Sequence, residues 1–188
     1  MIELKNISFS YGDVQILKNF NLNINPGEIV QLYGSSGSGK TTVARIILGL
    51  ETANSGHVIV PQKISTVFQE DRLLENVDVL KNIRLPLSKE QYEFADTLLK
   101  EFGLYDVRKK RVSKLSGGMK RRIAIIRAIA YNGDALILDE PFNGLDPENK
   151  KIAAKFIKKE FSDKGKPVLL ISHVDEDAQL LDARRISI

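Results

Sequence analysis

The chain has 188 residues, a length that can bury the core of one domain. Hydrophobic residues make up 43% and charged residues 28%, which excludes a disordered or fibrous protein. The 28 basic and 24 acidic residues leave a net charge of +4 without a long basic arm, so nucleic acid is not expected as a partner. Because there is no cysteine, disulfides, thiolate metal sites and a cysteine nucleophile are excluded. No apolar run approaches the roughly 18 residues that cross a bilayer, so a membrane role is expected to require a partner.

The first 33 residues are expected to be β structure, because apolar and polar residues alternate around two turns. The last of these strands, over 28–33, is mostly apolar and is followed by glycine, as expected of a buried strand. A helix should follow over about 40–50, where apolar residues recur at i, i+3, i+4 and i+7. Further strands are predicted over 55–60 and 64–68.

From about residue 73 to residue 114 the pattern becomes helical and strongly polar. One helix is marked by an apolar stripe, and Gly103 is suited to cap its C-terminal end. The stripe consists of Phe94, Leu98, Leu99 and Phe102. We therefore expect a helical subdomain that is inserted into an α/β core.

The alternation of helices and strands resumes after this insertion. The predicted elements are a helix over 116–131, a strand over 135–138, a helix with Asp146 as N-cap and Pro147 at its first position, a strand over 168–171, a short helix over 175–181 and a final strand over 185–188. Continuous apolar strands that alternate with helices predict a parallel sheet covered on both faces.

The strongest motif lies between the strand over 28–33 and the next helix. It reads Gly34-Ser35-Ser36-Gly37-Ser38-Gly39-Lys40-Thr41-Thr42, which is the P-loop pattern. Its glycines let the backbone curl so that several N–H groups point at one anion, and the helix N-terminus adds partial positive charge. Lys40 can reach the β- and γ-phosphates, and the Thr41 hydroxyl can ligate Mg²⁺. A flexible Gly/Ser-rich loop is the alternative, but the flanking strand and helix favour phosphate binding.

Two carboxylates, Asp139 and Glu140, follow the apolar strand over 135–138. The carboxyl ends of parallel strands form the ligand-binding edge of a sheet. Asp139 is suited to hold Mg²⁺ through water, and Glu140 is suited to accept a proton from an attacking water. A simple helix N-cap after a core strand is the alternative, and the nearby P-loop favours the functional interpretation.

A third motif, Leu115-Ser116-Gly117-Gly118, opens the helix over 116–131. Ser116 can be an ordinary N-cap. The serine hydroxyl and the glycine N–H groups can also form a second anion cradle, which a single phosphate chain rarely needs. Spacing alone favours the N-cap and leaves the second interpretation open.

Together and in this order, these motifs resemble the nucleotide-binding subunit of an ATP-binding cassette (ABC) transporter. The resemblance includes Gly144-Leu145-Asp146 and Ser172-His173 and covers nearly the whole chain. It implies an α/β fold with a P-loop NTPase parallel-sheet core, an N-terminal antiparallel β subdomain and an inserted α-helical subdomain. On this basis residues 1–188 would form a single ABC ATPase domain. Residues 1–72 and 121–188 would be the nucleotide-binding core, and residues 73–120 the helical subdomain with the Leu-Ser-Gly-Gly signature.

The resemblance also implies roles that the residues alone do not indicate. Tyr11 is similar to the aromatic that stacks on adenine, although by itself it would be a turn residue. Gln69 is similar to the glutamine that touches Mg²⁺ and the attacking water, so that Thr41, Gln69 and Asp139 would be the metal contacts. Asp146 is similar to the aspartate that makes a contact across the dimer interface. His173 is similar to the histidine that contacts the γ-phosphate. The resemblance also implies that the signature contacts the γ-phosphate bound to the other protomer, through Ser116, Gly117 and Gly118.

Three further features refine this prediction. Met119 stands where the signature usually has glutamine, at a position not expected to be essential for phosphate contact. The chain ends 15 residues after His173, as expected of a minimal domain without an appended regulatory region. The run from Gln69 to Leu74 resembles the corresponding loop in nitrate, sulfonate and taurine importers. This favours import, with a small two-component exporter as the alternative.

The resemblance therefore implies an ATPase that uses ATP and Mg²⁺ and drives an ABC membrane permease as a head-to-tail homodimer or heterodimer. Its expected location is cytoplasmic, peripheral on the inner face of the cell membrane through the permease. A soluble ABC ATPase acting in DNA repair or translation is the alternative, although such proteins usually carry two cassettes or a long coiled coil. A non-hydrolysing ATP-binding scaffold is a third possibility, against which Glu140 and His173 count. The transported molecule would touch the permease, so the sequence does not name it.

Overall fold

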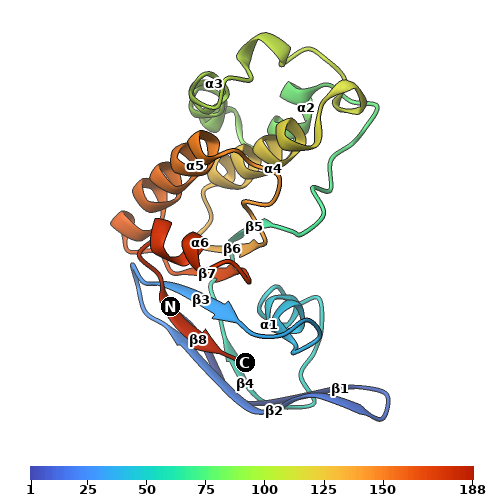
Figure 1. Cartoon of the computed structure of the whole chain (residues 1–188), viewed down its shortest axis with the longest axis vertical. Helices are drawn as coiled ribbons and strands as arrows, with labels where there is room; N and C mark the ends of the chain where they lie inside the picture. Colours follow the sequence, from blue (N-terminus) through green and yellow to red (C-terminus); the bar gives the residue numbers. More distant parts are fainter.

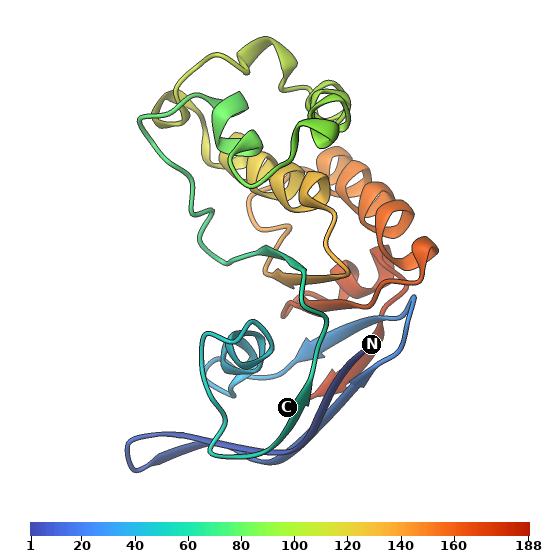
Figure 2. The same cartoon turned by 180° about the vertical axis from the view of Figure 1, so that it is seen from behind.

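A computed structural model describes all 188 residues of the chain. An antiparallel sheet lies at one end of the long axis and a group of short helices at the other, with a parallel sheet between them (Figure 1). The view from behind shows the same order (Figure 2). The predicted fold class, an α/β protein with a parallel core sheet, an N-terminal antiparallel sheet and additional helices, is confirmed.

The five-stranded sheet is parallel throughout. Its strand order is β5 (Ile64–Val67), β6 (Ala135–Asp139), β7 (Val168–Ile171), β3 (Ile29–Tyr33) and β8 (Arg184–Ser187). Alternate residues of one strand enter two different apolar cores, as Leu136 and Leu138 do on one face and Ala135 and Ile137 on the other. Because both faces are covered, the inner strands are apolar at nearly every position.

The second sheet is antiparallel and has the order β2 (Val14–Ile24), β1 (Ile2–Tyr11) and β4 (Ser55–Ile59). Its inward residues, among them Ile2, Leu4 and Leu22, share a core with one face of the parallel sheet. The hairpin between β1 and β2 extends beyond this core, and β4 is exposed along its whole length. The hairpin therefore brings Tyr11 out toward the carboxyl ends of the parallel strands.

Helices cover the two faces of the parallel sheet. Helix α1 (Lys40–Ile47) packs between the parallel and antiparallel sheets, whereas α4 (Gly117–Tyr131) and α5 (Pro147–Glu160) pack on the opposite face. The short helices α2 (Val79–Arg84) and α3 (Tyr92–Glu101) lie beyond α4 at the far end of the molecule, and α6 (Asp175–Leu180) follows β7. Short 3₁₀ turns lie at Lys89–Gln91, Tyr105–Val107, Val112–Lys114 and Ser162–Lys164.

Most of the predicted element boundaries are confirmed, with one clear exception. Asp146 caps α5, Pro147 is its first residue, and Gly103 follows α3 with a left-handed φ of +64°. Helix α1, however, ends at Ile47 rather than at residue 50. Gly49 adopts a φ of +68° and turns the chain away from the helix axis, so the helical spacing of Leu50 does not bury that side chain.

None of the helices is both long and apolar enough to cross a membrane. The longest, α4, has 15 residues.

Candidate active site

An open pocket of about 770 Å³ lies at the carboxyl ends of the parallel strands. It gathers most of the site residues that the sequence predicts, from five separate segments of the chain. The predicted residues that line it are Tyr11, Gly34, Ser35, Ser36, Gly37, Gly39, Lys40, Thr41, Thr42, Gln69, Asp139, Glu140 and His173. The ligand-binding edge expected from strand direction is therefore where these side chains meet.

The glycine-rich loop connects β3 to α1 and forms one wall of the pocket. Gly39, with a φ of +102°, is the N-cap of α1, and a Cβ there would lie 3.0 Å from side-chain carbons of Ile16 and Leu17. The position therefore requires glycine for both conformation and space. Lys40 Nζ donates to the carbonyl oxygens of Gly34 and Ser35, at 2.8 Å each, which holds the ammonium group over the loop.

The loop has the properties of an anion site. The N–H groups at the start of α1 have no helical partners and carry partial positive charge. The Ser38 hydroxyl is buried and has no hydrogen-bond partner within the chain. A phosphate group would accept hydrogen bonds from these donors and from Lys40, so the residues present fit a phosphorylated ligand.

The end of β6 places a buried carboxylate opposite the first turn of α1. Asp139 is only 5% exposed, and Oδ2 accepts a hydrogen bond from the Thr41 hydroxyl at 3.3 Å. Burial raises the pKa of Asp139, the Thr41 hydrogen bond lowers it, and the neighbouring charge of Glu140 raises it further. A cation at this position would compensate the cost of the buried charge.

The oxygen atoms of Thr41 and Asp139, together with Gln69 on the same pocket, fit a divalent hard cation such as Mg²⁺. The chain has no cluster of three or more His, Cys, Asp or Glu side chains that could hold a metal alone. Mg²⁺ is usually bound by one or two carboxylates together with the phosphates of its ligand, so few protein ligands are needed.

Glu140 and His173 form a pair across the ends of β6 and β7. His173 Nδ1 lies 2.8 Å from Glu140 Oε1, and the Glu140 N–H donates to the carbonyl of Ile171 at 2.9 Å. Glu140 adopts a φ of +50°, an unfavourable backbone conformation that is typical of functional sites. Its second oxygen, Oε2, is buried without a partner in the chain and is available to accept a hydrogen bond.

Two arginines of α4 hold the loop that carries Gln69. Arg121 is buried and donates to the carbonyls of Phe68, at 2.7 Å, and of Gln69. Arg127 donates to the carbonyl of Asp71 and to that of the following residue, at 3.0 Å each. Burial raises the pKa of Asp71, and the charges of Arg121, Lys120 and Arg127 oppose this increase. The loop backbone is thus fixed to α4, while Gln69 itself reaches the pocket.

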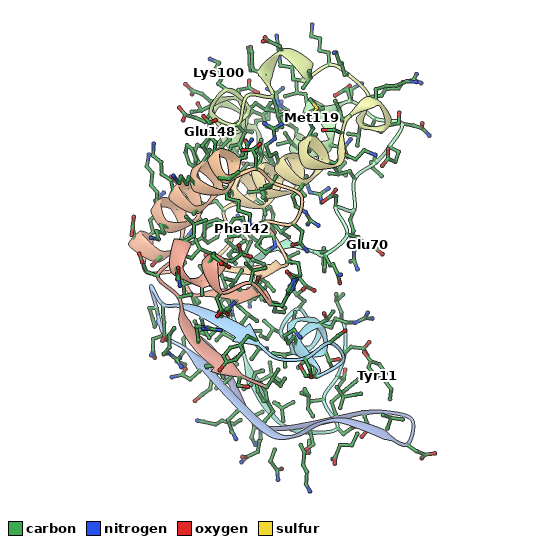
Figure 3. All side chains as sticks on the ribbon, viewed as in Figure 1. Tyr11, Glu70, Lys100, Met119, Phe142 and Glu148 are labelled. Carbon is green, nitrogen blue, oxygen red and sulfur yellow. The ribbon has the colours of Figure 1, made fainter.

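Tyr11, at the end of β1, presents an aromatic ring to the pocket. The ring packs edge-on against Phe9, with centroids 4.8 Å apart, and its hydroxyl donates to Glu51 at 3.2 Å. Tyr11 lies beside α1 in Figure 3, whereas Met119, in the first turn of α4, is on a different part of the molecule. Tyr11 is 46% exposed, which leaves room for a planar group to stack on its ring.

The structure does not bring the signature residues or Asp146 to this pocket. The exposed Ser116 caps α4 by accepting from the Met119 N–H at 3.3 Å, so the N-cap interpretation is confirmed. Asp146 caps α5, and hydrogen bonds from Asn149 lower its pKa. Gly117 is also outside the pocket. Any phosphate contact of these residues would have to involve a nucleotide bound elsewhere.

Three lining residues were not expected from the sequence: Ile16, Asn143 and Ile171. Ile16 lies on β2 near Tyr11, and Ile171 is the last residue of β7. Asn143 follows Glu140 by three residues, so the motif around the carboxylates could have indicated it. The two isoleucines carry no motif, and only the packing of the hairpin and of the strands places them at the pocket.

These features define a class of protein. An anion-binding loop between a buried strand and a helix, facing a buried aspartate at the end of another parallel strand, is the arrangement of a P-loop nucleoside-triphosphate-binding domain.

Comparison with known proteins makes the assignment specific. Residues 17–143 match the ABC transporter family, to which the chain therefore belongs. It is 34% identical to a phosphonates import ATP-binding protein of Fusobacterium nucleatum, over 95% of this chain and 85% of that protein. It is 37% identical to an aliphatic sulfonates import ATP-binding protein of Rhodococcus jostii, over 97% of this chain and 77% of that protein.

Solved structures agree with the family assignment. The dimeric structure of a bacterial ABC transporter cassette matches the whole chain and 94% of its own length, with 32% identity and a TM-score of 0.89. A second structure, a dimeric post-hydrolysis state bound to ADP and Pi, has 30% identity and the same TM-score. The predicted family and general function, an ATP-binding and ATP-hydrolysing subunit of an ABC transporter, are confirmed. The soluble alternative in DNA repair or translation is not favoured.

Proposed function

We propose that the chain binds Mg-ATP in the pocket at the ends of β3, β6 and β7 and hydrolyses it to drive import by a membrane permease. The observation that carries this proposal is the Glu140–His173 pair, in which the buried Oε2 of Glu140 has no partner within the chain. This oxygen is placed to accept the proton of an attacking water. Import is supported by the names of the phosphonate and sulfonate relatives.

The pocket residues that the sequence predicted have proposed roles in this reaction. Lys40 and the N–H groups of the loop bind the phosphates, and Thr41, Gln69 and Asp139 hold Mg²⁺, which neutralises phosphate charge. Glu140 is the general base, and His173 binds the γ-phosphate and orients Glu140 through their hydrogen bond. Tyr11 stacks on adenine.

The signature residues require a second chain. Ser116, Gly117 and Gly118 lie at an exposed helix start outside the pocket of their own chain. We infer that they bind the γ-phosphate held by a partner in a head-to-tail dimer, with Asp146 at the interface. The dimeric cassettes among the similar structures support this arrangement.

The proposed permease partner fits an apolar surface beside the Gln69 loop. Two depressions of about 620 and 260 Å³ share Ile64 and Tyr131 in their walls. Pro86 lines the smaller one, and the adjacent Leu85 is 70% exposed. Such a surface suits an apolar segment of a membrane subunit. Binding of the permease at this surface would hold the chain on the cytoplasmic face of the membrane. Residues 73–120 would then be the helical subdomain next to the permease.

The catalytic proposal is tested with Glu140→Gln, which retains the shape of the side chain but cannot accept the proton. We expect ATP affinity to be retained and hydrolysis to slow by roughly 10²–10⁴-fold. Because ATP then persists, the variant should accumulate as an ATP-dependent dimer in gel filtration. Glu148→Gln, an exposed glutamate on α5, is the matched control. Wild-type turnover of Glu140→Gln would show that another group is the base.

The partner proposal is tested by co-purification with the permease. Leu85→Glu places a charge beside the apolar depressions at an exposed position, so the fold should tolerate it. We expect less permease to be recovered with this variant. Val14→Glu, at a 63% exposed position on the hairpin, should recover the wild-type amount. Equal recovery with both variants would exclude this surface as the docking site.

A further inference from the structure

Gln31 is a polar side chain in the middle of the parallel sheet. It lies on β3, which is paired on both sides by β7 and β8, and its exposed fraction is 0%. Its neighbours in the strand, Val30 and Leu32, are apolar and buried. Burying an amide without hydrogen bonds would destabilise the folded protein. The buried amide of Gln31 is therefore expected to have hydrogen-bond partners within the chain.

Both ends of this amide are hydrogen-bonded, through its two N–H donors and one of the two lone pairs of its oxygen. Nε2 donates to the carbonyl oxygens of Ser172 and Val174, at 3.1 Å each. Oε1 accepts from Arg185 Nε at 2.9 Å. Two acceptors at one end and a cationic donor at the other fix which way the amide points, because the reversed orientation would lose all three bonds. A buried amide that is hydrogen-bonded at both ends holds its partners in one arrangement.

The two carbonyls that Gln31 binds flank His173. The His173 side chain is 67% exposed, and its only hydrogen bond within the chain is to Glu140. Its placement therefore depends on the backbone of residues 172–174. From the other side, the Ser172 hydroxyl accepts from the Val174 N–H at 3.1 Å and donates to Asp177 at 2.7 Å.

We propose that Gln31 is a positioning residue for His173: through the carbonyls of Ser172 and Val174 it fixes the backbone that holds the imidazole against Glu140. This inference rests on the proposed role of the Glu140–His173 pair. Gln31 itself lies beneath the strand ends and does not line the pocket, so it acts through the backbone of residues 172–174 rather than on the nucleotide.

The first test observes the histidine directly and does not require activity. The chain has two histidines, His173 and His57, and His57 lies on the exposed strand β4. In NMR spectra of the whole chain, Gln31→Met should shift or broaden the ring signals of His173 and leave those of His57 unchanged. Methionine retains the approximate size of glutamine but has no N–H donor. Unchanged His173 signals in a folded variant would overturn the proposal.

The second test separates positioning from general destabilisation. Gln31→Met should lower kcat about tenfold or more while ATP affinity stays within about twofold. In a His173→Ala background the same substitution should cause no further loss, because the group it positions is gone. An equal loss in that background would show a merely structural role. Ser65→Ala, which removes a buried hydrogen bond to Gly133 at the far edge of the sheet, should leave kcat unchanged.

If Gln31→Met fails to fold, Arg185→Met provides the decisive variant. Arg185 lies on the edge strand β8, and its replacement frees Oε1 of Gln31 but also breaks the bond from Arg185 to Asp175 at 2.6 Å. Asp175→Ala, which removes only the second contact, is therefore the matched control, and the effect assigned to Gln31 is the part of the shift that this control does not reproduce. The His173 ring signals should move in the same direction but less. Their complete invariance would overturn the proposal. The NMR test does not depend on ATPase activity. If the chain proves inactive, the proposed function fails, but the NMR result still shows whether Gln31 positions His173.

Discussion

The P-loop and the Leu-Ser-Gly-Gly signature are two glycine-containing helix starts with the same local chemistry and different surroundings. The P-loop at α1 lies against β6, β7 and the β1–β2 hairpin, which complete a pocket around it. The signature at α4 is exposed, and its Ser116 hydroxyl caps its own helix. Free N–H groups at a helix start therefore do not make a site by themselves. The site at the P-loop is completed by residues of the same chain. We propose that the site at the signature is completed by the nucleotide and P-loop of a second chain.

Lys40→Ala should have the largest effect, because it removes the lysine ammonium group from the complete site. Its ammonium group can form two charge-assisted hydrogen bonds, worth about 1.5–3 kcal/mol each, so ATP affinity should fall by roughly two to four orders of magnitude. Isothermal titration calorimetry measures this change. Lys151→Ala, at an exposed position on α5, should bind ATP like the wild type. Unchanged affinity of Lys40→Ala would remove Lys40 from the site.

Ser116→Arg should abolish hydrolysis while ATP binding stays intact, since the P-loop of the same chain is whole. The larger, charged side chain blocks the contact with the partner's nucleotide, so the variant should remain a monomer in gel filtration with ATP. The measurements are calorimetry, chromatography and an ATPase assay on one preparation. A monomer that cannot bind ATP would place Ser116 in the pocket of its own chain and contradict the head-to-tail dimer.

Mixing Lys40→Ala with Ser116→Arg should restore activity that neither variant has alone. In a mixed dimer one site carries both lesions and the other carries none, so up to about a quarter of wild-type ATPase should return if the sites act independently. Lys40→Ala mixed with Glu140→Gln is the matched control, because both residues line the same pocket and every site stays damaged. Equal activity in the two mixtures would contradict sharing of sites between chains.

Tyr11→Ala should weaken the complete site moderately. Stacking of a base on an aromatic ring is worth about 1–3 kcal/mol and depends little on which base is bound, so ATP and GTP should be affected alike. Tyr11→Phe keeps the ring and loses only the hydrogen bond to Glu51, and should bind nearly as well as the wild type. Competition binding with both nucleotides measures the effect. Selective loss of ATP would show recognition of the adenine edge instead.

The smallest effect is expected where β8 supports the strand that leads to the P-loop. Glu28, just before β3, has a pKa lowered from 4.5, first by its hydrogen bond from Arg184. A lowered pKa in the folded state means that the stabilisation is present above the unfolded value and is lost as the pH falls through the folded one. For this partly exposed pair it amounts to about 0–1 kcal/mol. Urea unfolding of Glu28→Gln should differ from the wild type at pH 7, and the difference should shrink below pH 4.5.

Sequence patterns predicted those parts of the fold whose causes are local. The P-loop, the cap at Asp146 and the buried strands follow from residues that are close in sequence, and the structure places them as expected. The predicted end of α1, at about residue 50, was wrong because the left-handed backbone conformation of Gly49 ends the helix although the apolar spacing continues to Leu50. The contacts of Gln31 could not be predicted, because they join residues 141 and 143 positions apart in a polar pairing that no periodicity marks.

The attachment of the Gln69 loop to α4 has a consequence for how two nucleotides would influence each other. Arg121 and Arg127 belong to the helix that Ser116 begins, so a change in the tilt of this helix also moves the loop backbone beside the pocket. If Ser116 contacts the partner's ATP, binding at one site changes the position of Gln69 at the other. The dimer should then respond cooperatively to ATP, with a Hill coefficient above one that Arg121→Gln lowers. A coefficient that this substitution leaves unchanged would show that the loop and the helix act independently.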